Sequence, residues 1–116
     1  MRRYDTWVCV ADGRSARFFC CDPQRHLEPV MDFGIPDNPG PLAGRLAGQL
    51  DRAVRGDRFE HLVLVGPRSF LREVEGHVAP PTRERILADV IDPTLIRSTP
   101  REVACHLSGL LPQGAG

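Results

Sequence analysis

Few of the residues that can carry chemistry fall into a catalytic or metal-binding spacing. The histidines His26, His61, His77 and His106 stand far apart, and the four cysteines form no Cys-x-x-Cys pair. Ser69 follows Gly-Pro-Arg rather than the Gly-x-Ser-x-Gly pattern of a nucleophile elbow. These patterns indicate no zinc site, disulfide framework or nucleophilic triad. We therefore expect no metal, no cofactor and no catalytic residue.

The carboxylate best placed for chemistry is Asp12, which follows an apolar strand pattern and precedes Gly13 and Arg14. A two-metal nuclease needs carboxylates inside its strands. The two most apolar segments, Val8 to Val10 and Leu62 to Val65, contain none. An Asp-Gly pair between strands is typical of a hairpin turn. We therefore predict that Asp12 is a turn residue, and that Asp12, Gly13 and Arg14 form a binding tip.

One face of a predicted helix carries cationic residues. Arg45, Gln49 and Arg52 recur at i, i+4 and i+7, opposite much of a leucine stripe. Such a face can contact phosphates. The alternative is a solvated face whose charge is offset by Asp51. The sequence leaves both interpretations open.

Composition bounds the function classes. The chain has 116 residues, enough for one domain spanning 1–116, and equal numbers of basic and acidic residues. It lacks the overall basic field of many nucleic-acid-binding proteins, so such binding would need a local patch. All basic residues are arginines, which excludes lysine-based chemistry. No signal-like apolar stretch or membrane-length run occurs, so we expect a cytoplasmic protein without a membrane span.

The elements are organised around the apolar run Leu62 to Val65, which predicts a central strand buried on both faces. Three strands are expected before it, and Pro29 places the third at an edge. A Pro- and Gly-rich stretch, 34–44, predicts an irregular loop. The expected strands lie at 6–11, 15–21, 27–33, 62–65 and 86–91; the expected helices lie at 42–54, 67–78 and 99–111, with a short helical turn at 82–85.

The ends of these helices carry their own signals. Gly56 is predicted to end the first helix in the left-handed conformation. Pro67 is expected in the first turn of the second helix, with Ser69 as a capping serine. Thr99 and Glu102 form the capping box of the last helix.

Three antiparallel strands followed by helix-linked strands predict an α/β fold on the ribonuclease-H-like plan. The mixed five-stranded sheet would have the element order βββ-α-β-α-β-α, with helices packed on it. The third and fifth strands are candidate edges, and either leaves room for pairing in a homodimer.

Two blocks of this sequence resemble the bacterial host attachment protein family. The first runs from Trp7 to Phe19, Trp-Val-Cys-Val-Ala-Asp-Gly-Arg-Ser-Ala-Arg-Phe-Phe, and the second from Leu62 to Leu71. The Thr-Pro-x-Glu helix at Thr99 is similar too. The resemblance implies a role in attachment to host cells. It also implies a fold similar to the middle domain of archaeal and eukaryotic peptide-chain release factors.

In those release factors a Gly-Gly-Gln loop before the first helix promotes peptidyl-tRNA hydrolysis. The corresponding stretch, 34–45, has no Gly-Gly-Gln, and Ala47-Gly48-Gln49 falls inside a predicted helix. We therefore expect a non-enzymatic domain that binds an unidentified macromolecule and serves in attachment to host cells. The alternative is a translation-associated factor that binds the ribosome or structured RNA. A third, a hydrolase of peptidyl-tRNA-type esters with Gln49 positioning water, is weaker.

Overall fold

A five-stranded mixed sheet forms the centre of the computed structural model, which describes residues 6–12, 14–21, 26–30, 41–92 and 97–107. The strand order is β3-β2-β1-β4-β5. The first three strands are antiparallel, whereas β4 lies parallel to β1 and β5 lies parallel to β4. The strands are β1 (Thr6–Ala11), β2 (Ala16–Cys21), β3 (Leu27–Pro29), β4 (His61–Gly66) and β5 (Ile86–Ile91). The predicted α/β plan is confirmed.

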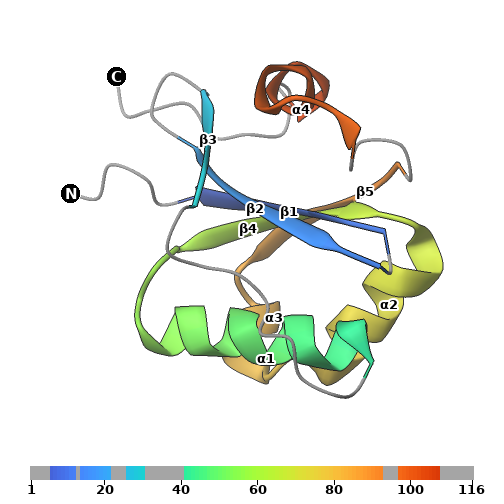
Figure 1. Cartoon of the computed structure of the whole chain (residues 1–116). Coiled ribbons are helices and arrows are strands. Elements are labelled where there is room, and N and C mark those ends of the chain that lie inside the picture. The colour runs from blue at the N-terminus through green and yellow to red at the C-terminus, as the bar shows by residue number, and fades with distance from the viewer. Residues whose placement is uncertain (1–5, 13, 22–25, 31–40, 93–96, 108–116) are drawn as a thin grey trace.

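The helices cover both faces of the sheet. Figure 1 shows α1, α2 and α3 on one face and α4 on the other. Their bounds are α1 (Leu42–Arg55), α2 (Arg68–His77), α3 (Pro80–Arg83) and α4 (Pro100–Leu107). This arrangement explains the near-continuous apolar pattern of the inner strands, because a strand covered on both sides has no wet face. Every residue of β1 is buried, and so is every residue of β4 from Leu62 to Gly66.

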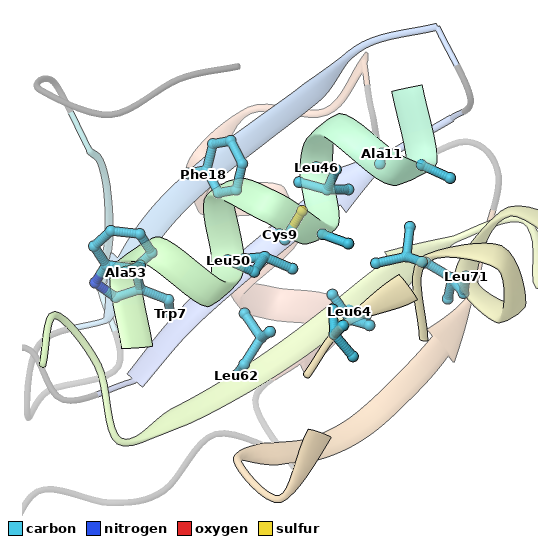
Figure 2. Packing of buried hydrophobic residues seen from close by; sticks show 14 of the residues in the cluster. Trp7, Cys9, Ala11, Phe18, Leu46, Leu50, Ala53, Leu62, Leu64 and Leu71 are labelled. Carbon is cyan, nitrogen blue, oxygen red and sulfur yellow. The ribbon is translucent and has the colours of Figure 1, made fainter. Parts of the chain in front are cut away.

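Two apolar clusters, one on each face, hold the layers together. Figure 2 shows the larger cluster, where Cys9 of β1, Leu50 of α1 and Leu64 of β4 meet between helix and sheet. The smaller cluster joins the opposite face to Val103 and Leu107 of α4. The predicted burial of the Leu62 strand on both faces is confirmed. Its predicted central place is not, because β1 occupies the middle of the sheet and β4 lies beside it.

Several boundaries differ from the predictions. Of the irregular stretch expected over 34–44, residues 34–40 lie outside the described residues, and 42–44 are helical because α1 begins at Leu42, as predicted for the first helix. Pro67 is the N-cap of α2 rather than a residue of its first turn, and Ser69 lies inside the helix and caps nothing. The expected residues 31–33 of the third strand and 108–111 of the last helix lie outside the described residues.

Other local predictions are confirmed. Pro29 ends β3, which is an edge strand. In α4, the Thr99 N–H donates to Glu102 Oε1 at 2.9 Å, and the Glu102 N–H donates to Thr99 Oγ1 at 3.1 Å. These two bonds form the predicted capping box and satisfy donors that the first helical turn leaves unpaired.

The end of α1 corrects the prediction for Gly56. Gly56 has φ −84°, and the left-handed residue is Asp57, with φ 58°. The Arg58 N–H donates to Ala53 O at 2.9 Å and the Asp57 N–H to Val54 O at 3.0 Å, the two bonds of a Schellman motif. The helix therefore runs one residue further than the glycine suggested.

This correction predicts that Gly56→Ala is tolerated. An added Cβ would meet its nearest neighbour, the Arg52 carbonyl oxygen, at an ordinary 3.5 Å. Alanine also reduces the conformational entropy of the unfolded chain, so we expect a gain of about 0.4–1 kcal/mol in the free energy of unfolding. Urea denaturation of both proteins measures it. A loss of more than about 1 kcal/mol would mean that residue 56 is left-handed after all.

Burial controls the chemistry of Cys9, which lies under α1 (Figure 2). Desolvation raises the pKa of the Cys9 thiol from 9.0 to about 12. Above pH 9 the unfolded chain releases this proton while the folded chain keeps it, so stability falls as the pH rises. From these two pKa values we expect a loss of about 1.4 kcal/mol between pH 8 and pH 10.

Denaturant unfolding at both pH values tests this expectation, with Cys9→Ala as the control that should lose most of the pH dependence. An equal slope in the two proteins would show that Cys9 is not the responsible group.

Candidate functional site

The Asp12 turn is built as the sequence predicted. Asp12 Oδ1 accepts hydrogen bonds from the Arg14 N–H at 2.9 Å and the Ser15 N–H at 3.0 Å. The bond from Ser15 and, to a smaller extent, the bond from Arg14 hold the pKa of the Asp12 carboxyl below its usual range. The ionised carboxylate thus fixes the shape of the turn, and Arg14 lies exposed on it. Gly13 lies outside the described residues.

A cleft of about 430 Å³ lies beside this turn. It is lined by the ends of three elements: Asp12 after β1, the start of α1 and the start of α2. The lining residues are Asp12, Pro41, Leu42, Ala43, Pro67, Ser69, Phe70 and Glu73. In open α/β sheets, ligands bind beyond the carboxyl ends of parallel strands, which is where this cleft lies.

Gly66 brings these elements together. A Cβ on Gly66 would lie 2.3 Å from the Ala11 carbonyl oxygen, so only glycine allows the ends of β1 and β4 to approach this closely. Asp12 follows the first of these strand ends and Pro67 follows the second. The width of the cleft therefore depends on one glycine.

The cleft offers both hydrogen-bond donors and acceptors. Helices α1 and α2 both begin after a proline, Pro41 and Pro67, and neither has a side-chain cap or an acidic residue in its first turn. First-turn residues of both helices line the cleft, so the positive ends of both helix dipoles lie beside it. The carboxylates of Asp12 and Glu73 supply acceptors beside them. Such a mixture suits a polar ligand that carries hydroxyl groups as well as negative charge.

The cationic residues predicted on one helix face lie along α1, beginning one turn beyond the cleft. Arg45 and Gln49 are half-buried, and Arg52 is exposed, as is Arg55 in the last turn. The structure thus places Asp12 and Arg14 at the turn and the other three predicted residues along α1. It brings the turn close to the start of this helix, but not to the whole of the predicted face.

Asp51, the acid expected to offset these arginines, has another role. Asp51 Oδ1 accepts the Ala79 N–H at 3.0 Å and the Thr82 hydroxyl at 2.6 Å. The carboxylate is thus directed at the start of α3, and Thr82 is buried. Asp51 therefore joins α1 to α3.

Asp51→Ala should therefore cost stability. It removes two hydrogen bonds and leaves the buried Thr82 hydroxyl without this acceptor, a loss of about 2 kcal/mol. Asp51→Asn keeps an acceptor oxygen and should cost less than half of that. Thermal or urea unfolding of the three proteins measures both effects. Equal losses in the two variants would show that the negative charge matters rather than the hydrogen bonds.

The sequence did not identify the contribution of α2. The sequence pattern predicts only a capping role for Ser69, yet Ser69 lines the cleft together with Phe70 and Glu73. The available signal was the Gly66-Pro67 pair, because a helix that begins directly after a parallel strand presents its first turn at the carboxyl edge of the sheet.

The described part of the chain contains neither a candidate metal site nor a candidate membrane-spanning helix. Among the residues placed there, no three His, Cys, Asp or Glu side chains form a group that could hold a metal ion. Within the same residues, no helix has both the length and the apolar character needed to cross a membrane.

The chain matches the model of one known protein family. Residues 37–107, more than half of the chain, match the model of bacterial archaeo-eukaryotic release factor family 12. The chain belongs to this family. The match extends from before α1 to the end of α4, so it covers both helix-linked strands and every lining residue of the cleft except Asp12. No curated protein matches the chain.

The sequence resembled two groups of proteins, the host attachment family and the release factors, and the family match supports the second. The similarity to release factors is shown, whereas membership of the host attachment family is not confirmed. Of the segments behind the resemblance to the host attachment family, Leu62 to Leu71 and the Thr99 helix lie inside the matched region, and Trp7 to Phe19 lies outside it.

Proposed function

We propose that this protein is a non-catalytic, translation-associated domain that binds structured RNA, with the ribosome as its foremost target. Membership of a release-factor-like family supports the link to translation. The absence of a Gly-Gly-Gln sequence anywhere in the chain supports binding without peptide release. A cytoplasmic location follows from this proposal.

The observation that carries RNA binding is the one-sided charge of α1. Arg52 lies between Arg45 and Arg55, which are ten residues apart, or about 15 Å along the helix. The carboxylate of Asp51 is directed at α3. An arginine row of this length can contact successive phosphates of a nucleic-acid backbone.

The cleft complements this row. Ribose hydroxyls can donate to Asp12 and Glu73, while a phosphate can approach the first turns of α1 and α2. We therefore assign phosphate contacts to α1 and sugar contacts to the cleft. Arg14, exposed on the neighbouring turn, extends the same surface.

Co-sedimentation of the purified protein with ribosomes at low and high salt tests the proposal. We expect sedimentation at low salt that is lost as salt rises, because phosphate contacts release counterions. A parallel assay of peptidyl-tRNA hydrolysis should show no turnover. No sedimentation at any salt would reject ribosome binding, and turnover abolished by Gln49→Ala would favour the hydrolase alternative.

Attachment to host cells, the function first expected, stays a prediction. The matched family has release factors in its description and gives this role no support. Binding to a protein receptor would depend less on salt than binding to RNA does. Binding to host cells that persists at high salt, together with no ribosome sedimentation, would favour this role.

A further inference from the structure

The two edges of the sheet differ in how well they are protected. The β3 edge has three residues and ends in proline, which cannot donate to another strand. The β5 edge has six residues. Leu87 and Ile91 on β5 are each 47% exposed, the large apolar side chains most open to solvent among the described residues. An exposed apolar edge of this length is a surface for strand pairing.

The hydrogen-bonding direction of β5 defines which groups a new strand would meet. The Asp92 N–H donates to Gly66 O of β4 at 3.2 Å. Backbone groups alternate in direction along a strand, so those of Val90 also face β4. The backbone N–H and C=O groups of Asp89 and Ile91 therefore face away from the sheet.

Charged side chains surround this edge on the α2 side. Arg68, Arg72, Glu75 and Asp89 line a cleft of about 320 Å³ together with Ile91. Burial, and then the neighbouring Asp89, raise the pKa of Glu75. Asp89 thus disfavours the ionisation of Glu75, and a cation arriving at this point would stabilise the charged form of Glu75.

We propose that β5 pairs antiparallel with β5 of a second copy of this chain, about a two-fold axis at Val90. In this register Asp89 lies opposite the partner's Ile91, so the outward backbone groups of both residues form hydrogen bonds. The same pairing places the partner's Arg68, which lies near its own Ile91, beside Asp89 and Glu75. The sheet would become a continuous ten-stranded sheet.

Charge selects this register over its neighbours. An axis at Asp89 would set two Asp89 carboxylates opposite each other, beside two Glu75 side chains, and like charges directly opposite destabilise a sheet. An axis at Ile91 would set Asp89 opposite Pro93, which has no N–H to donate. The carboxylate in the middle of the edge thus acts against unspecific pairing and in favour of the register that brings arginine to it.

The irregular start of β5 limits the pairing to its second half. The register between β4 and β5 shifts at Leu62/Val63, so that Leu62 pairs with Ile86 and Val63 with Ala88. Such a bulge interrupts an edge ladder. The proposed axis at Val90 uses the regular part of the strand beyond it.

Sedimentation equilibrium of the full chain over a concentration series tests the dimer. We expect the mass of two copies at high concentration. Asp89→Arg and Arg68→Asp should each raise the dissociation constant at least tenfold, and the double variant should restore it to within about threefold. A monomer at every concentration would overturn the proposal, as would a dimer that these variants leave unchanged.

Cysteine cross-linking tests the register independently, in a Cys105→Ser background that removes the exposed native thiol. At the proposed axis the two Val90 Cα atoms would lie about 4.5 Å apart, within disulfide range. Val90→Cys should therefore oxidise to a covalent dimer. Leu87→Cys is more exposed, but its two copies would lie roughly 20 Å apart and should stay unlinked. Faster linking at Leu87 than at Val90 would overturn this register.

Discussion

Gly66→Ala should destabilise the protein by about 3 kcal/mol or more. A methyl group on Gly66 would lie 2.3 Å from the Ala11 carbonyl oxygen, which belongs to the β1 backbone and cannot move without disturbing the sheet. Gly66 also has φ 159°, at the limit of the region that favours glycine. Overpacking and backbone strain each cost about 1–3 kcal/mol. We expect the melting temperature to fall by roughly 10 °C or more.

Gly48→Ala is the matched control for this prediction. Gly48 lies in the exposed part of α1, and a Cβ there would meet nothing within 4 Å. Alanine is favoured over glycine inside a helix, so the same substitution should raise the free energy of unfolding by up to about 1 kcal/mol. Opposite signs would confirm that the approach of β1 to β4 decides the effect. A loss below about 1 kcal/mol at Gly66 would show that the strands can separate cheaply.

The second large effect concerns RNA binding. Arg45→Gln/Arg52→Gln should weaken ribosome binding about 10- to 30-fold at physiological salt, because two phosphate contacts would be lost. The dependence of log K on log salt should become shallower by about 1.4–1.8, since each contact contributes 0.7–0.9 to that slope. Both quantities come from the same binding titrations at several salt concentrations.

Arg97→Gln/Arg101→Gln provides the control, because it removes the same charge from exposed residues. Arg101 lies in α4, which covers the opposite face of the sheet (Figure 1). This variant should keep most of the affinity and nearly the whole salt slope. Equal losses in both double variants would mean that total charge, and not the α1 row, drives binding. Circular dichroism of all proteins confirms that they are folded.

The identity and order of the strands and helices could be predicted from the sequence because they depend on local patterns. The unbroken apolar run of β4 requires that both faces of the strand be covered. The leucine spacing of α1 requires that one face of the helix be buried. The Thr99 capping box is formed between residues three apart. Where the signal was a glycine near a helix end, the prediction failed by one residue, since the hydrogen bonds of Asp57 and Arg58 decide which residue becomes left-handed.

The candidate site was predictable only in its separate parts. The Asp12 turn and the arginine spacing of α1 are local, and the sequence determined both. The cleft required tertiary structure, because it joins residues from the ends of β1, α1 and α2 that no sequence spacing relates. The direction of Asp51 also depended on where α3 packs, since its partners Ala79 and Thr82 lie far along the chain.

By itself, the sequence determined the α/β class, the interior strand and the two local surfaces, since short-range periodicity and turn chemistry encode them. The tertiary structure decided that β1 occupies the middle of the sheet, that Gly66 sets the distance between β1 and β4, and that α2 completes the cleft. Those features depend on contacts between segments distant in sequence, and such contacts are fixed only when the whole core packs.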